Sequence, residues 1–102
     1  MDSPRDSLTL AKRCADLLDE KKLQDIKLFH VAKDIQITDY FVIASGLNTR
    51  HLRAASDHLL KEFRENGVVR SGMEGYGESG WILIDFDDVV VHLFGGMRSA
   101  AN

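Results

Sequence analysis

Hydrophobic and polar residues alternate most regularly over residues 81–94 of the chain. Two alternating runs are separated by Asp87-Asp88, a pair typical of a two-residue β-turn. We therefore predict a hairpin of two antiparallel strands. When the strands are paired across this turn, one face is entirely apolar and is expected to join a core. Its members are Ile82, Ile84, Phe86, Val89, Val91 and Leu93.

The other face of this hairpin mixes apolar and polar side chains, and it carries the only Trp of the chain. Its members are Trp81, Leu83, Asp85, Val90, His92 and Phe94. A strand face of this mixed kind is typical of a surface that docks a partner protein. The alternative is a sheet covered on both faces, with His92 and Asp85 hydrogen-bonded at its edge, and the pattern alone fits that interpretation at least as well.

Two amphipathic helices precede the hairpin. Apolar residues recur at helical spacing from about residue 8 to residue 22, after polar residues that suit a helix start. A second, stronger helix is expected from residue 48 to Asn66-Gly67, a helix-stopping pair. Its expected buried stripe comprises Leu52, Ala55, Leu59, Leu60 and Phe63.

Three further strands are expected at residues 25–31, 40–45 and 68–73, the second apolar enough to be buried on both faces. The order is then α-β-β-α-β-β-β. A crossover through the second helix makes the strands on either side of it parallel. We predict a single α/β (α+β) domain over residues 1–102, a mixed five-stranded sheet with helices packed on one face. Residues 1–6 are expected to form a frayed start, and residues 95–102 an irregular tail.

Composition narrows the function classes. The 102 residues carry a formal net charge of −3, so a general grip on nucleic-acid backbone and sequence-specific nucleic-acid binding are not expected. Cys14 is the only cysteine, which excludes an intramolecular disulfide and a Cys-based zinc site. The longest apolar run, residues 40–44, is far too short to span a membrane. A cytoplasmic location is expected.

The acidic residues of the hairpin raise the question of a metal site. Asp85, Asp87 and Asp88 could suggest one, but Asp is common in turns for backbone reasons, and the turn interpretation is favoured. His51 and His58 lie two helical turns apart with no third ligand at suitable spacing, so a solvated helix face is expected for both.

Residues 46–49 connect a strand to a helix and could hold a phosphate at the helix N-terminus. They lack the glycine-rich dinucleotide pattern and the lysine of a P-loop, and helix capping explains them better. No serine has the context of a nucleophile. No catalytic residue, metal or cofactor is predicted, and a nucleotide-handling enzyme is kept only as an alternative.

Several short motifs follow one another in an order that resembles the ribosomal silencing factor family, also called RsfS, Iojap or YbeB. The resemblance covers about residues 14–94. The motifs are Asp25-Ile26, Ile37-Thr38-Asp39-Tyr40-Phe41-Val42-Ile43-Ala44-Ser45-Gly46, Arg50-His51, Glu74-Gly75, Gly80-Trp81, Asp85 and Val91-His92.

This resemblance implies a fold related to the nucleotidyltransferases but without their catalytic carboxylates. It also implies a protein that binds the large ribosomal subunit at its L-fourteen protein. Members block joining of the small subunit and lower translation when nutrients are scarce. The family's binding face includes the Trp that opens the fourth strand, which matches Trp81. We therefore expect the ribosomal-protein-binding residues to be Trp81, Leu83, Asp85, His92 and Phe94.

The chain departs from the family pattern after Phe94. Members normally continue with a tail of the form F-Y-x-L-E-x-L-W, whose Tyr, Leu and Trp add to the partner surface, whereas residues 95–102 here contain none of these three. The affinity for the ribosome is therefore left open. A homodimer that uses the same hairpin face is a further alternative.

Overall fold

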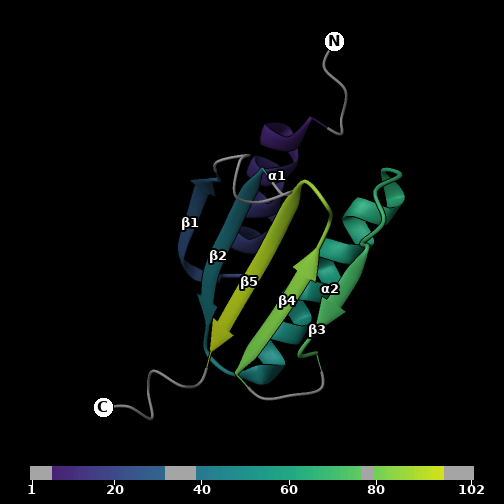
Figure 1. Cartoon of the computed structure of the whole chain (residues 1–102). Coiled ribbons are helices and arrows are strands. Elements are labelled where there is room, and N and C mark those ends of the chain that lie inside the picture. Colours follow the sequence, from purple (N-terminus) through teal and green to yellow (C-terminus); the bar gives the residue numbers. More distant parts are fainter. Residues whose placement is uncertain (1–5, 32–38, 77–79, 96–102) are drawn as a thin grey trace.

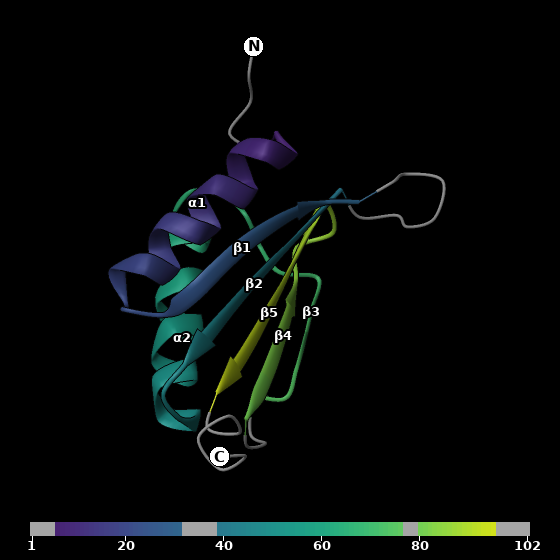
Figure 2. The same cartoon turned by 90° about the vertical axis from the view of Figure 1, so that its left-hand side faces the viewer.

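The structure is a computed structural model that describes residues 6–31, 39–76 and 80–95. Two helices lie side by side against one face of a five-stranded sheet, and the layers are seen edge-on in Figure 2. The expected order α-β-β-α-β-β-β is confirmed. The elements are α1 (Ser7–Glu20), β1 (Gln24–His30), β2 (Tyr40–Gly46), α2 (Thr49–Glu65), β3 (Gly72–Glu74), β4 (Trp81–Asp85) and β5 (Val89–Gly95).

The strand order across the sheet is β1-β2-β5-β4-β3. The β2–β5 pair is parallel and the other three pairs are antiparallel, so the predicted mixed sheet is confirmed. The strands before and after α2 also run in the same direction, as expected for a crossover. They do not pair, because β5 and β4 lie between them (Figure 1).

Each helix starts at a side-chain cap. The Asp6 carboxylate accepts a hydrogen bond from the Thr9 amide at 3.2 Å, and the Asn48 side chain accepts one from the His51 amide at 2.9 Å. Both bonds satisfy N–H groups that lack a partner inside the helix. The buried residues of both helices recur at helical spacing and face the sheet. They are Leu10, Ala11, Cys14, Leu17 and Leu18 on α1, and Leu52, Ala55, Ser56, Leu59 and Phe63 on α2.

The core lies between the helices and the sheet. All six residues of the predicted apolar hairpin face are buried there. The Phe86 ring packs on the Phe63 ring of α2 with centroids 4.9 Å apart. The Phe86 amide donates to the Val89 carbonyl at 2.9 Å, which closes the hairpin around Asp87-Asp88 as predicted.

Two expectations are wrong. The strand expected at residues 68–73 is confined to β3, because Val68 is hydrogen-bonded through its amide to the Phe63 carbonyl at the end of α2. Val69 is 71% exposed, and the chain reaches the sheet edge at Ser71, whose amide donates to the Asp85 carbonyl at 2.7 Å. β2 is not buried on both faces, since Phe41 and Ile43 are only half-buried.

The expected frayed start and irregular tail lie largely outside the described residues. The described exceptions are Asp6, which caps α1, and Gly95, which ends β5. Among the residues that the structure describes, no helix is long and apolar enough to cross a membrane.

Candidate functional site: the uncovered face of the sheet

Both helices cover the same face of the sheet, so no described element covers the other face (Figure 2). Within the described residues, the alternative of a sheet covered on both faces is therefore wrong. All five predicted site residues lie on this uncovered face. Across β4 and β5, Trp81 is paired with Phe94, Leu83 with His92, and Asp85 with Val90.

Aromatic rings form a row across the uncovered face. The rings of Phe41 and His92 meet edge to face, with centroids 5.2 Å apart and planes at 74°. The His92 and Phe94 rings are nearly parallel, at 10°, with centroids 6.4 Å apart. Trp81 lies opposite Phe94 on one side of this group, and Phe29 lies opposite Phe41 on the other. The row thus extends from β4 to β1.

The members of the aromatic row differ in exposure. Phe29 is 45% exposed and Phe94 is 38% exposed, whereas Trp81, Phe41 and His92 are half-buried. Single exposed apolar residues are ordinary, but several aromatic side chains gathered on one uncovered sheet face make that face the candidate interaction surface. Aromatic side chains are also the residue type most enriched in the centres of protein interfaces.

The His92 imidazole lies between the rings of Phe41 and Phe94 and is partly removed from water. Desolvation by burial lowers the pKa of His92 below its ordinary value. The imidazole is therefore neutral at pH 7 and adds no charge to the surface. A partner could cover it without the large cost of burying an ion.

Asp85 points toward its own turn. Its carboxylate accepts a hydrogen bond from the Asp87 amide at 2.8 Å, and the Ser71 hydroxyl donates to the Asp87 carboxylate at 2.9 Å. Asp87 has a positive φ of 73°, a backbone conformation that Asp tolerates better than most residues. The turn interpretation of these acidic residues is confirmed. Among the described residues, no group of three His, Cys, Asp or Glu side chains could hold a metal ion.

The N-terminus of α2 is occupied by internal contacts. The Leu47 amide donates to Nδ1 of His51 at 2.9 Å, and Thr49 Oγ1 accepts from the Gly80 amide at 3.2 Å. With the Asn48 cap described above, these bonds occupy the amide N–H groups of Leu47, His51 and Gly80, and free N–H donors are what a phosphate needs. The capping interpretation of residues 46–49 is therefore confirmed.

The expectation that His51 and His58 form a solvated helix face is wrong. His51 Nε2 donates to the Lys21 carbonyl at 2.6 Å, and His58 Nε2 lies 2.8 Å from the Glu20 carboxylate. Both histidines face the C-terminal end of α1, because positions seven residues apart share one side of a helix. They join the two helices and lie away from the uncovered sheet face.

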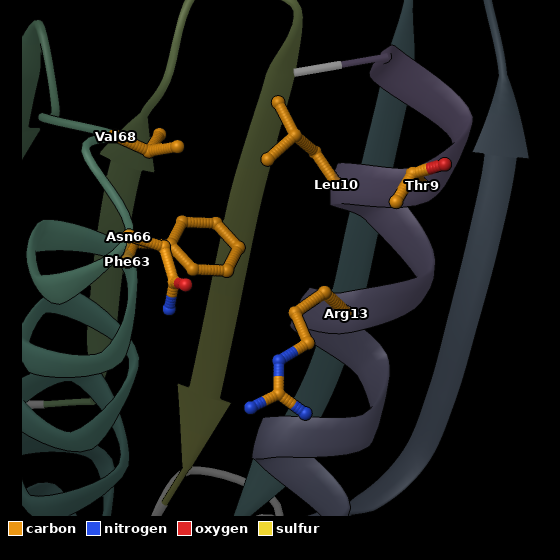
Figure 3. Close-up of a pocket in the computed structure, with 6 residues that line it drawn as sticks. All are labelled: Thr9, Leu10, Arg13, Phe63, Asn66 and Val68. Carbon is orange, nitrogen blue, oxygen red and sulfur yellow. The ribbon is translucent and has the colours of Figure 1, made fainter. Parts of the chain in front are cut away.

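A separate hollow of about 230 Å³ lies between α1 and α2 (Figure 3). Arg13 reaches into it from α1, with its guanidinium 3.5 Å from the Glu62 carboxylate. Its walls contain none of the predicted site residues, and it opens on the helix layer. The lining residues are Thr9, Leu10, Arg13, Phe63, Asn66 and Val68.

Sequence reasoning missed Phe29, Phe41 and Ile43 as members of the uncovered face. Ile43 is paired with His92 and Phe41 with Val90 in the parallel β2–β5 ladder. The apolar run of β2 is nearly continuous, so its sequence does not show which of its residues face outward. The exposed Phe29 in a strand rich in polar residues was the one available signal.

Comparisons with known proteins agree with the fold and define its class. A crystal structure of a protein from Chromobacterium violaceum is similar, with a TM-score of 0.81 and 27% identity, and the match covers 86% of this chain and 73% of that one. The class is a single α+β domain with a mixed five-stranded sheet and two helices. The family described as "Ribosomal silencing factor during starvation" matches residues 4–99. The chain belongs to this ribosomal silencing factor family.

Two relatives illustrate the range of proteins that this chain resembles. The ribosomal silencing factor of Bacillus subtilis is 33% identical over 86 residues, which cover 84% of this chain and 73% of that protein. A mouse protein named "Mitochondrial assembly of ribosomal large subunit protein 1" is 37% identical over 82 residues. That match covers 76% of this chain and 35% of the mouse protein.

Proposed function

We propose that this protein is a translational repressor that docks on the large ribosomal subunit, at its L-fourteen protein, through the uncovered sheet face. The docked protein sterically blocks joining of the small subunit and lowers translation under nutrient limitation. Family membership supports a regulatory role in silencing or assembling ribosomes. The name of the mouse relative supports the large subunit as partner.

The observation that carries this proposal is the aromatic row on the face that the helices leave free. Trp81, Leu83, His92 and Phe94 are the proposed anchors, and Asp85 is their polar neighbour. A few aromatic anchors near the centre of an interface commonly supply most of its binding energy. The two helices lie on the opposite side of the sheet (Figure 2), so they would point away from the docked surface.

Steric blocking needs no catalytic group. A body that occupies one subunit's contact surface excludes the other subunit by volume alone, provided that its own affinity is sufficient. The action would be exerted where ribosomes are, which in a bacterial cell is the cytoplasm.

Co-sedimentation with purified large subunits, beside an equal amount of small subunits, tests the proposal. We expect binding to large subunits alone. Trp81→Ala should weaken that binding by at least about 1–2 kcal/mol and leave the circular dichroism spectrum unchanged. Val69→Ala is the matched control, because Val69 is an exposed apolar residue away from the sheet face. Equal binding of the Trp81 variant and the wild type would contradict the assignment of the anchor.

A homodimer through the same face is the second candidate, favoured by the exposure of Phe94 and Phe29 on one surface. Self-complementary apolar faces commonly pair around a two-fold axis. Light scattering at several protein concentrations, for the wild type and for Phe94→Glu, distinguishes a monomer from a homodimer. A dimer that the substitution dissociates supports this candidate, and a monomer at the highest concentration rejects it.

A further inference from the structure

Trp81 packs directly against the backbone of the residue that follows β3. Gly75 has a φ of +83°, and a Cβ atom built on it would lie 2.3 Å from the Trp81 carbonyl oxygen and 2.9 Å from Cε3 of the indole. No side chain fits in that space, and L residues rarely adopt that φ. The position of the indole ring is therefore coupled to the position of the Gly75 backbone.

The next residue ties this backbone to α2. The Tyr76 hydroxyl lies 3.0 Å from both carboxylate oxygens of Asp57 and donates its hydrogen to that carboxylate. Arg53 Nε donates to the Tyr76 carbonyl at 2.8 Å, and the guanidinium carbon lies 5.5 Å from the centre of the Tyr76 ring. We call Arg53, Asp57 and Tyr76 the α2 clasp. Asp57 and Arg53 are one helical turn apart, so they present both groups on the same side of α2.

The hydrogen bond to Asp57 favours the protonated form of the Tyr76 phenol. The hydrogen bond to the Asp57 carboxylate, with smaller contributions from burial and the carboxylate charge, raises the pKa of Tyr76. The phenol therefore keeps its proton at neutral pH and donates it in this hydrogen bond. A charged acceptor makes this a stronger hydrogen bond than a neutral pair would form.

The other side of Trp81 is also fixed to α2. The Gly80 amide donates to Thr49 Oγ1 at 3.2 Å, and the Gly80 carbonyl accepts from the Gly95 amide at 3.1 Å. Trp81 is thus held between two backbone segments that are each anchored to the same helix. That helix packs against β4 and β5 on the covered side of the sheet (Figure 1).

From these contacts we infer that the α2 clasp is a positioning device for Trp81, which holds the Gly75 backbone under the indole and presets the ring for docking. The inference rests on the proposed function, since it names the residues that prepare the proposed anchor. A side chain that is already ordered before binding loses less conformational entropy in the complex. Arg53, Asp57 and Tyr76 act through Trp81 and need no contact with the partner.

Trp81 is the only Trp in the chain, so its fluorescence reports this site without interference. The first experiment measures acrylamide quenching and time-resolved anisotropy of Trp81 in the wild type, Tyr76→Phe and Asp57→Asn. We expect stronger quenching and faster local motion in both variants, with an unchanged circular dichroism spectrum. Glu65→Gln is the matched control, because it removes an exposed carboxylate of α2 that pairs with Lys61 instead. Wild-type quenching and anisotropy in both clasp variants would overturn the inference.

The second experiment is a double-mutant cycle of Tyr76→Phe and Trp81→Ala, which measures the affinity of each variant for large ribosomal subunits. Tyr76→Phe should weaken binding roughly two- to tenfold, the range expected from the ordering of one side chain. In the Trp81→Ala background, Tyr76→Phe should have no further effect, because the clasp then has no indole to position. An equal loss in both backgrounds would show that Tyr76 acts independently of Trp81 and would overturn the inference.

The two experiments separate the failure of the inference from that of the proposed function. If the wild type binds no large subunits, the proposed function fails, while the fluorescence experiment still decides whether the clasp orders Trp81. If the wild type binds and the clasp variants bind equally well, the inference alone fails.

Discussion

The imidazole of His92 meets the edge of the Phe41 ring, with centroids 5.2 Å apart and planes at 74°. This contact joins β5 to β2 on the side of the sheet that no described helix covers. It also explains why a histidine on an uncovered face is partly desolvated. The neutral imidazole behaves here as one more ring of the aromatic row.

The first prediction concerns pH. Because burial lowers the pKa of His92 in the folded state, the unfolded chain takes up a proton first as the pH falls. The stability that depends on neutral His92 is complete above the unfolded pKa, about 6.5. It falls as the pH decreases from there toward the lowered folded pKa. Urea unfolding between pH 7.5 and 5 should therefore show a steeper loss of stability for the wild type than for His92→Leu.

Other histidines and the carboxylates titrate in both of these proteins, so their contributions cancel in the difference between the two profiles. Parallel profiles for the wild type and His92→Leu would contradict the prediction.

The second prediction concerns the far end of the aromatic row. Phe29→Ala should weaken binding to large subunits if the docking surface extends from β4 to β1. Since Phe29 is 45% exposed, we expect the free energy of unfolding to change by less than about 1 kcal/mol. Co-sedimentation beside Val69→Ala measures the effect. Full affinity in the Phe29 variant would confine the docking surface to the hairpin and its neighbour β2.

The elements that a short stretch of sequence determines could be predicted. The hairpin turn at Asp87-Asp88 and its apolar face follow from an alternation with period two, and the stripe of α2 follows from helical spacing. The five proposed site residues share a face for the same reason. The motifs then identified the family, which the alternation could not do.

The features that were missed depend on contacts between distant residues. The outward residues of β2 depend on its pairing with β5, which lies more than 40 positions later in the chain. The short β3 is the exception, because the bond from Val68 back to Phe63 that limits it is a local one. The α2 clasp joins Tyr76 to Asp57 across 19 positions of sequence. No periodicity of a single segment contains such information.

The third prediction compares the two histidines that join the helices. His51 accepts from the Leu47 amide and donates to the Lys21 carbonyl, so His51→Ala removes two hydrogen bonds to the backbone. We expect a loss of about 1–3 kcal/mol in the free energy of unfolding. His58→Ala removes only a contact with Glu20, a side chain that is 53% exposed, and should cost about 0–1 kcal/mol. Chemical denaturation of both variants gives the comparison, and an equal cost would contradict it.

The fourth prediction uses the single cysteine. Cys14 is fully buried on α1, and burial raises the pKa of its thiol. The thiolate that reacts with disulfide reagents is therefore scarce and inaccessible in the folded protein. Labelling by an aromatic disulfide at pH 8 should be at least about a thousandfold slower in buffer than in denaturant. Rapid labelling in buffer would mean that α1 opens readily from the sheet.

The order of the strands has a consequence for synthesis. β5 lies in the middle of the sheet but comes after every other described strand in the sequence. The β1–β2 pair and the β3–β4 pair are therefore not joined until β5 pairs with both of them. A nascent chain that ends before residue 89 can form the β1–β2 pair and the β3–β4 pair, but nothing joins the two pairs. The helices then lack the central strand of the sheet against which they pack. The cooperative domain therefore forms only when residues 89–95 have left the exit tunnel of the ribosome that makes it, and its uncovered sheet face becomes complete at the same moment.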